Sequence, residues 1–206
     1  MITERIYVVS RQLGSISQLI SWFEAWGVFF RNPKSGDSAM LLSDGSRIAT
    51  NPSELDVRCT SGEAVHFLLW LDSATQVYVR VMELGGTHFL ESYDFDALTA
   101  FERNAMRLLL GIRFAMLRCT ESALLVDSNE VDREDLWREF SKGSALRLEP
   151  EPDLLITSRC LLASRSARPQ VVEIEGHKYT VLLGAARLRL GPLVSVATGE
   201  THWDTT

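Results

Sequence analysis

The residues best suited to chemistry lie in one short stretch, LLVDSNEVDREDLWREF, which spans residues 124–140. A dense group of carboxylate and amide side chains there follows an apolar run, and such a group can bind a metal, transfer protons or begin a helix. The stretch opens like a calcium-binding loop, with Asp127 at the first position and Asn129 at the third. The match then fails, because Asp132 stands where the loop needs glycine and Arg138 where it needs a bidentate glutamate. We therefore predict no metal site.

The same stretch fits the start of a helix better. Asp132 can cap the first turn, and Asp135 stands where the helix dipole favours negative charge. The pattern predicts a strand, a tight turn and a short helix over about residues 133–142, which Gly143 ends. The side chains of this stretch that capping does not use are predicted to bind a partner. They are Asp127, Glu130, Glu134, Trp137 and Glu139. For the tryptophan, burial in a second core layer is the alternative.

Elsewhere the chain carries no short motif of known mechanism. It has no G-x-x-x-x-G-K-[ST], G-x-G-x-x-G or H-E-x-x-H, so neither a phosphate cradle nor a helical zinc pair is predicted, and no cofactor is expected. The stretch GDSAM at 36–40 lacks the second glycine and the leading strand of a nucleophile elbow. Glu91, Asp94 and Asp96 precede a predicted long helix, where capping explains them without catalysis.

Four histidines are scattered along the chain: His66, His88, His177 and His202. None lies next to a candidate nucleophile in the sequence. A Cys59–His66 dyad, or an active site that gathers other distant residues, stays an alternative. A deep cavity that held two or more of His66, His88, Cys59 and the carboxylates would favour that reading.

Composition and charge narrow the classes of function. With 46% hydrophobic and 23% charged residues, this 206-residue chain is typical of a globular protein and not of a disordered one. The net charge of −6 opposes nucleic-acid binding, which needs neutralisation of phosphates. It suits a cationic protein partner, although solubility alone also explains it.

Cysteine usage and the N-terminal sequence favour a cytoplasmic location. Cys59, Cys119 and Cys160 are far apart and form no C-x-x-C pair, which fits a reducing compartment. The first residues, MITERIYVVSRQ, show no signal peptide, and no apolar run approaches the roughly 18 residues of a membrane span. We expect no membrane association.

Apolar periodicity predicts the elements that position these residues. In the first part of the chain they are a strand at 5–9, a helix at 15–26, a hairpin at 39–49 and a loop at 51–56. Ser15 can cap the helix and Gly27 can end it, and Trp26 belongs to its predicted core stripe. The hairpin turns at Asp44-Gly45.

Residues 65–82 are predicted to form two strands joined by a short loop. Their apolar residues share one face only if paired residue numbers sum to an even value. We therefore predict Leu71 opposite Val77, which places Trp70 opposite Tyr78 on the reverse side and Leu68 opposite Arg80. That reverse side is apolar enough to meet a second layer or a partner.

A long helix is predicted over about residues 95–118, with Asp94 or Asp96 as its cap. Its predicted core stripe is Leu98, Phe101, Ala105, Leu108, Leu109, Ile112, Ala115 and Met116. The arginines of this helix are predicted to lie mostly off the stripe: Arg103, Arg107, Arg113 and Arg118.

The fold class that follows is α+β, with a mostly antiparallel sheet covered on one face by the helices at 15–26 and 95–118. Residues 1–147 are predicted to form the α+β domain. Residues 148–206 are β-rich and either extend the same sheet or form a small subdomain. Within them a hairpin is predicted that pairs Ile174 with Tyr179.

These observations favour a non-enzymatic protein-binding module. Its sharpest form is a bacterial immunity or antitoxin-type inhibitor, whose acidic surface binds a cationic protein such as a toxin or effector. Two alternatives stay open: an enzyme with a dispersed, motif-less active site, and a structural subunit that forms a homo-oligomer.

Overall fold

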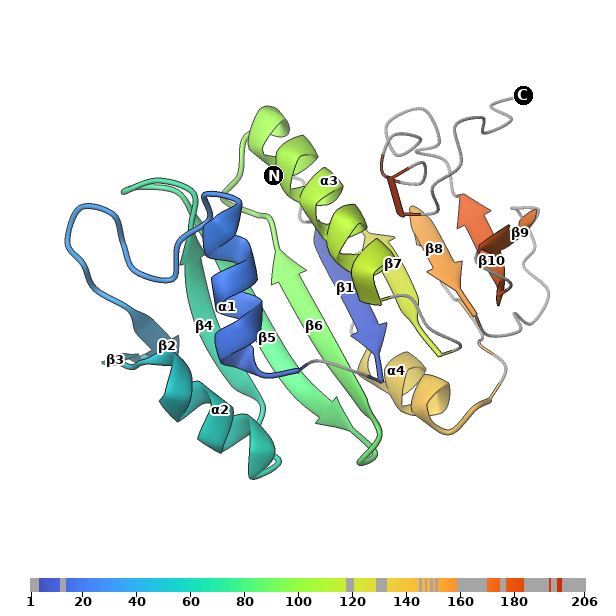
Figure 1. Cartoon of the computed structure of the whole chain (residues 1–206), viewed down its shortest axis with the longest axis horizontal. Helices are drawn as coiled ribbons and strands as arrows, with labels where there is room; N and C mark the ends of the chain where they lie inside the picture. Colours follow the sequence, from blue (N-terminus) through green and yellow to red (C-terminus); the bar gives the residue numbers. More distant parts are fainter. Residues whose placement is uncertain are drawn as a thin grey trace.

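The computed structural model describes residues 4–11, 14–117, 121–128, 133–144, 146, 148, 150, 152–158, 170–174, 177–183, 193, 196 and 197. Within them the chain forms four helices and one ten-stranded sheet in which every neighbouring pair is antiparallel (Figure 1). The predicted α+β class is confirmed. No helix in this part of the chain is long and apolar enough to cross a membrane.

The sheet order departs widely from the chain order. Across the sheet lie β3 (Arg47–Ala49), β2 (Ala39–Leu41), β4 (Val65–Trp70), β5 (Gln76–Leu84), β6 (His88–Asp94), β1 (Arg5–Ser10), β7 (Ala123–Asp127), β8 (Leu154–Thr157), β10 (His177–Leu183) and β9 (Gln170–Ile174). The first strand of the chain is therefore central, between β6 and β7. The last three strands continue the sheet that the earlier strands begin.

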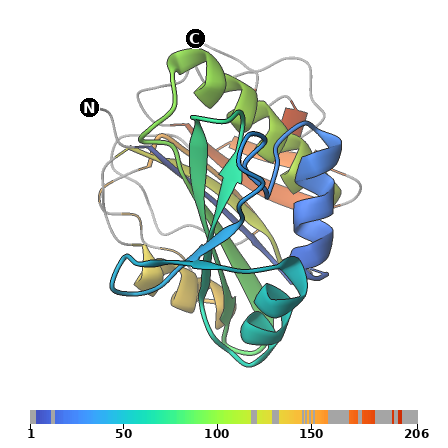
Figure 2. The same cartoon turned by 90° about the vertical axis from the view of Figure 1, so that its left-hand side faces the viewer.

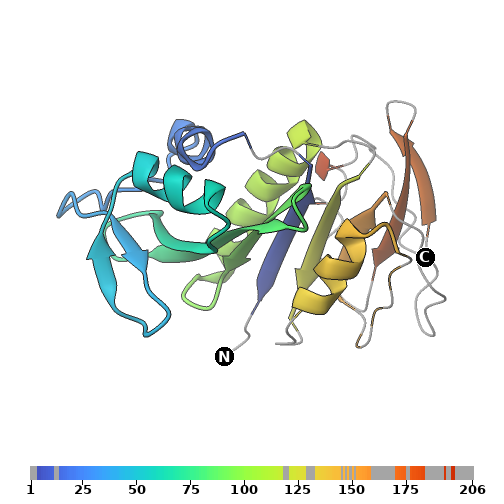
Figure 3. The same cartoon turned by 90° about the horizontal axis from the view of Figure 1, so that it is seen from below.

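Helices lie on both faces of the sheet. One face, here called the helix face, carries α1 (Ile16–Ala25), α2 (Pro52–Thr60) and α3 (Ala100–Leu117) (Figure 2). The opposite, reverse face carries α4 (Glu134–Ser141) (Figure 3). Strand residues alternate between the two faces, so each face has its own apolar core. Phe67 and Tyr93 belong to the first core, and Val9, Leu125 and Trp137 to the second.

The predicted start and end of α1 are confirmed. The Ser15 hydroxyl accepts a hydrogen bond from the backbone N–H of Gln18 at 3.1 Å, and Gly27 follows the helix with a φ of 79°. Trp26 does not belong to the core as predicted, since it is 54% exposed. Asp56 of α2 supplies a second cap, because its carboxylate accepts from the backbone N–H of Ile16 at 2.5 Å.

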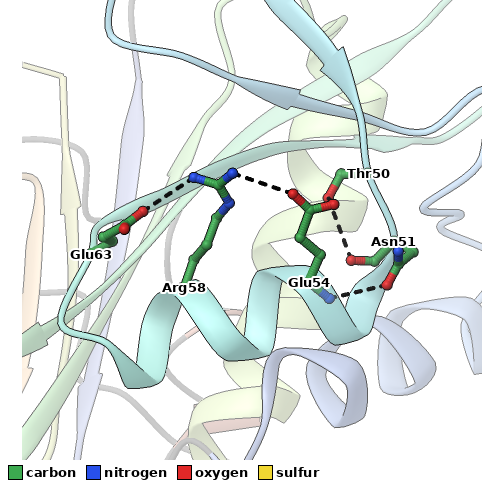
Figure 4. A network of polar contacts seen from close by, with 5 residues as sticks. All are labelled: Thr50, Asn51, Glu54, Arg58 and Glu63. Atoms are coloured by element: carbon green, nitrogen blue, oxygen red, sulfur yellow. Dashed lines mark hydrogen bonds and ion pairs between the residues drawn. The ribbon is translucent and has the colours of Figure 1, made fainter.

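The predicted loop at 51–56 is wrong, because this segment begins α2. The side-chain oxygen of Asn51 accepts from the backbone N–H of Glu54 at 3.0 Å, and Pro52 takes the first helical position, where its missing N–H costs nothing. Only Leu55 and Cys59 are buried, so the helix has almost no apolar stripe to be recognised by. Figure 4 shows the polar network that ties its outer side together: Thr50, Asn51, Glu54, Arg58 and Glu63.

Helix α3 starts later than predicted, and its cap is different. Thr99 and Glu102 form a capping box, in which the backbone N–H of Thr99 donates to the Glu102 carboxylate at 2.7 Å and the N–H of Glu102 donates to the Thr99 hydroxyl at 3.3 Å. Asp94, one of the predicted caps, ends β6 and pairs with Arg5 at 3.2 Å.

Two hairpins have a register that is shifted by two residues from the predicted one, and the first of them keeps the predicted faces. Leu69, not Leu71, lies opposite Val77, and Tyr179 lies opposite Val172, not Ile174. A shift of two keeps every side chain on its own face, so the apolar pattern cannot detect it. In the first hairpin Asp72 decides the register, because its carboxylate accepts from the backbone N–H groups of Ala74 and Thr75 at 2.7 Å and closes the turn early.

Candidate functional site

Two rows of side chains cross the reverse face between β4 and β1, as the strand registers dictate. One row is His66, Arg80, Ser92 and Tyr7, and the next is Leu68, Tyr78, Asp94 and Arg5. Helix α4 lies beside these rows and contributes Glu134 and Trp137. Together they border a partly open cavity of about 190 Å³, here called the α4 cavity. Its lining residues are Arg5, Tyr7, His66, Tyr78, Arg80, Leu90, Ser92, Asp94, Glu134 and Trp137.

The charges that line the α4 cavity are paired, but unequally. Arg5 Nε donates to Asp94 at 3.2 Å, and this partner holds the pKa of Arg5 above its usual value although burial lowers it. Arg80 lies 3.7 Å from Glu134, near the limit of an ion pair. Glu134 makes a much closer contact, 2.6 Å, with Arg138 one turn further along α4. Arg80 therefore has the weakest charge partner.

A histidine and a tyrosine share a hydrogen bond in the cavity. His66 Nδ1 bonds the Tyr78 hydroxyl, and the two ring centroids are 5.7 Å apart. Burial lowers the pKa of His66, and the neighbouring Arg80 charge lowers it further. Burial raises the pKa of Tyr78. Both rings are thus neutral at neutral pH, and this pair offers hydrogen bonds but no activated nucleophile.

Two N–H donors of cavity-lining residues are buried without a hydrogen-bond partner among the described residues. They are Trp137 Nε1 and Arg80 Nε. Trp137 is fully buried, with its ring 5.5 Å from Tyr7 and 6.3 Å from Phe140. Buried donors are nearly always paired. Trp70 Nε1 and Arg58 Nε also lack a partner in the described part of the chain, but they lie apart from each other, whereas two such donors belong to residues of the α4 cavity.

The predicted partner-binding residues do not form one surface. Asp127 is buried and accepts from Arg133 Nε at 2.6 Å, and Trp137 lies in the second core. Glu134 is half-buried beside the α4 cavity, while Glu139 is exposed and pairs with Lys142 at 2.8 Å. The remaining predicted residue, Glu130, lies outside the described residues. Arg138 of α4 pairs with Glu134, and Lys142, directly after the helix, pairs with Glu139.

Sequence reasoning missed most of the cavity, for an identifiable reason. It placed Leu68 opposite Arg80, whereas the actual register places His66 there. It also had no signal for the pairing of β1 with β6, which brings Arg5 and Tyr7 beside the β5 and β6 side chains. One local feature in the sequence does fix the register of β4 with β5, and it is the Asx turn at Asp72.

The other candidate residues are held in structural roles. Cys59 is buried in the helix-face core, where burial raises the pKa of its thiol, while His66 lies on the reverse face. The Cys59–His66 dyad is therefore not formed. His88 is buried, and its Nε2 lies 3.3 Å from the Glu121 carboxylate. Among the described residues no three His, Cys, Asp or Glu side chains are grouped so as to hold a metal.

A second, more open hollow lies beside the β2–β3 hairpin. It measures about 590 Å³ and includes Ser38, the serine of the GDSAM stretch. The Ser38 hydroxyl donates to the carbonyl of Thr50 at 2.5 Å. No histidine is among the described residues that line this hollow, so these residues offer no imidazole base for a serine nucleophile.

Helix α3 presents apolar side chains to solvent. Its sheet side buries Met106, Leu109, Leu110 and Phe114. The opposite side, here called the outward stripe, exposes Phe101 by 83%, Met116 by 63% and Leu108 by 38%. Ala105, Ile112 and Ala115 lie between them, exposed or half-buried. These are largely the residues predicted to face the core, so that prediction is wrong for the outward stripe.

The reason for the inversion is a charge on the sheet. Glu91 of β6 points to the helix face and is buried, and Arg113 turns inward to meet it with contacts of 2.7 Å and 3.3 Å. Tyr93 donates to the same carboxylate at 2.5 Å, and the Arg113 guanidinium lies 5.7 Å from the ring centre of Trp22. Arg113 was predicted to lie off the core stripe. It instead sets which side of α3 faces the sheet.

Comparison of the chain with protein family models, with curated proteins and with solved structures found no match.

Proposed function

We propose that this chain is a non-enzymatic protein-binding module that binds its partner through the outward stripe of α3. The observation that supports this proposal is the exposure of Phe101, Leu108 and Met116 along one side of one helix. A surface helix normally has one apolar side, which faces the core, whereas α3 has a second apolar side opposite the first. Contiguous exposed apolar side chains on a globular protein are typical of an interaction surface.

The spacing of the outward stripe indicates the kind of partner. Phe101, Ala105, Leu108, Ile112 and Ala115 follow one another at intervals of four, three, four and three residues. This is the period of a seam along which two helices pack, with side chains of one in the gaps of the other. A partner that lays a helix along α3 fits this period best.

In its sharpest form the partner is a cationic protein and the module is an immunity or antitoxin-type inhibitor. The net charge of −6 supports this form, because it would steer a cationic protein towards the module. The acidic side chains of α4 contribute to that overall charge. They do not define a contact surface, because Glu134 and Glu139 are already paired with Arg138 and Lys142.

One observation favours an enzyme as the second candidate. The α4 cavity gathers His66, Asp94 and Glu134, which is the kind of grouping that distinguishes an active site from a bare surface. Against it, both carboxylates are paired with arginines, and the His66–Tyr78 pair is neutral. The protein-binding proposal is therefore preferred.

A pair of matched variants tests the proposal. Phe101→Ser combined with Met116→Ser removes the two most exposed apolar side chains of the outward stripe. Val57→Ser removes an equally exposed one, 68%, from α2 and serves as the control. Affinity capture from the source cells, followed by mass spectrometry, is expected to recover one partner with the wild type and the control. The α3 variant should retain that partner at least about tenfold less.

Two outcomes would overturn the proposal. One is a capture profile that the α3 variant leaves unchanged. The other is a light-scattering mass of twice 23.1 kDa that the α3 variant alone returns to a monomer, because the outward stripe would then bind a second copy of the chain.

A further inference from the structure

We propose that the α4 cavity is a binding site for a small monocarboxylic acid, of about the size of one six-membered ring with its carboxylate. The site lies on the reverse face, away from the outward stripe of α3, and does not depend on the protein-binding function.

The first argument is the pair of unpaired donors. Trp137 Nε1 and Arg80 Nε belong to two different elements, α4 and β5, and both residues line the same cavity. Each group can only donate, so the partner that both lack is an acceptor. Leaving one such buried donor unpaired costs roughly 1–3 kcal/mol. Both N–H atoms are covered in this structure, so a ligand oxygen reaches them only after the two side chains shift, and it then recovers that cost.

The second argument is the count of charges. Three guanidinium groups, those of Arg5, Arg80 and Arg138, share two close carboxylates, Asp94 and Glu134. Asp135 is a distant third partner of Arg138 at 3.8 Å, with its side chain 98% exposed, and solvent screens it. Among the described residues, this network therefore has one close carboxylate fewer than it has guanidinium groups.

Arg80 is the arginine that lacks a close carboxylate partner within the described ranges of the chain. Arg5 has Asp94 at 3.2 Å, and Glu134 is drawn to Arg138 at 2.6 Å, which leaves Arg80 with Glu134 at 3.7 Å. A ligand carboxylate placed against Arg80 would complete the network, while Glu134 keeps its contact with Arg138. A guanidinium also matches the planar, two-oxygen geometry of a carboxylate.

Size and walls define the rest of the ligand. A cavity of roughly 150 Å³ can hold one benzene ring, so 190 Å³ is enough for one ring with its carboxylate. Tyr7, Tyr78 and His66 supply flat ring surfaces, and Leu90 an apolar one. An aromatic or compact aliphatic acid fits such walls.

The test uses four probes on the intact protein: benzoate, benzamide, benzylamine and inorganic phosphate. Calorimetric titration should show saturable binding of benzoate, with benzamide at least about tenfold weaker because it lacks the charge. Benzylamine should not bind, because its ammonium can only donate and cannot pair with the N–H groups of Arg80 and Trp137. In the ¹⁵N spectrum, one tryptophan indole signal should shift with benzoate and be missing in Trp137→Phe.

Variants assign the contacts. Arg80→Gln should abolish benzoate binding, and Trp137→Phe, which keeps the ring and removes the donor, should weaken it by about tenfold. Arg31→Gln and Trp26→Phe remove the same groups elsewhere on the surface and should bind benzoate like the wild type. Arg80→Lys is a second variant for the case that Arg80→Gln does not fold, and it should also bind more weakly because it loses the two-pronged contact.

Any of three results would overturn the proposal. These are the absence of saturable binding of benzoate below about 10 mM in the folded wild type, tighter binding of phosphate than of benzoate, and equal benzoate affinity of the wild type and the Arg80 variants. None of them bears on partner capture through α3, so the two proposals fail separately.

Discussion

A buried ion pair explains why the sequence pattern of α3 misleads. Glu91 and Arg113 are both at least nine-tenths buried and lie between the sheet and α3, where two isolated charges would be very costly. Together, and with the Tyr93 hydroxyl as a further donor, they satisfy each other's hydrogen bonds. The pair orients the helix more specifically than its apolar residues do, since those occur on both sides.

Removing one partner of this pair should destabilise the fold strongly. Arg113→Met leaves the Glu91 carboxylate buried and unpaired, and we expect a loss of about 3–5 kcal/mol in the free energy of unfolding, measured in urea. The double variant Arg113→Met with Glu91→Leu should recover a large part of that loss, because no charge stays buried. Arg138→Met, on the surface of α4, is the control and should change stability by less than about 1 kcal/mol. Additive losses in the double variant would contradict a paired role.

The stability of the protein should fall in mild acid because of His66. Burial and the Arg80 charge hold the pKa of His66 below its ordinary value of 6.5, so the unfolded chain takes up the proton first. The stability that depends on neutral His66 is therefore present above about pH 6.5 and is lost as the pH falls from there towards the folded-state pKa. Urea unfolding at about pH 7.5 and pH 5.5 should show a smaller drop for His66→Gln than for the wild type. Carboxylate titration is common to both proteins, and an equal drop in both would exclude His66 as a cause.

At the scale of elements, the sequence predicts what is signalled locally and misses what depends on a neighbour. The N-cap Ser15 and the end at Gly27 are confirmed because they use only residues of their own helix. Helix α2 was not predicted, because asparagine and proline at its start are also typical of loops. In addition, only two of its apolar residues, Leu55 and Cys59, are buried. The hairpin registers are uncertain by two residues because alternation has a period of two.

Helix α2 also holds α1 in place, and this can be measured. The Asp56 carboxylate accepts from the backbone N–H of Ile16 at 2.5 Å and also bonds the Ser17 hydroxyl, so it caps a helix far from it in sequence. Asp56→Ala should lower the free energy of unfolding by about 1–2 kcal/mol, and Asp56→Asn by less, since the amide oxygen still accepts. Ser53→Ala, exposed on the same helix, is the control in the urea measurement. Equal stability of the two Asp56 variants and the control would mean that the interhelical cap contributes nothing.

At the scale of the whole molecule, the candidate sites depend on strand order. Arg5 lies between Asp94 of β6 and Asp127 of β7, which are distant from it in the sequence and from each other. Each strand is recognisable from its own residues, but its apolar pattern does not indicate which other strands pair with it in the sheet. The α4 cavity needs four strands in the right order with a helix over them, so sequence reasoning could identify several of its residues without bringing them together.

Strand order also predicts that the chain cannot be divided near residue 148. Strand β8 pairs with β7 along the sheet, and its Leu154 and Leu155 are buried in the cores of opposite faces. Further on, Leu193 packs against Gly111 of α3 so closely that a Cβ there would lie 2.7 Å from it. A chain that ends at residue 147 would leave the edge of β7 and both cores uncovered.

We expect such a truncated chain to lose its cooperative urea transition and its near-UV circular dichroism, because both apolar cores continue into the strands that it lacks. The control is a chain that ends at Ala197, which keeps β8, β10 and the contact with Gly111 and should unfold in one transition like the full chain. A cooperative transition in the chain of residues 1–147, at a urea midpoint close to that of the full chain, would instead identify two independent folding units. The outcome matters for function, since the outward stripe of α3 and the α4 cavity lie on opposite faces of one sheet. If that sheet folds only as a whole, neither site can be isolated on a shorter chain, and both proposals must be tested on the intact protein.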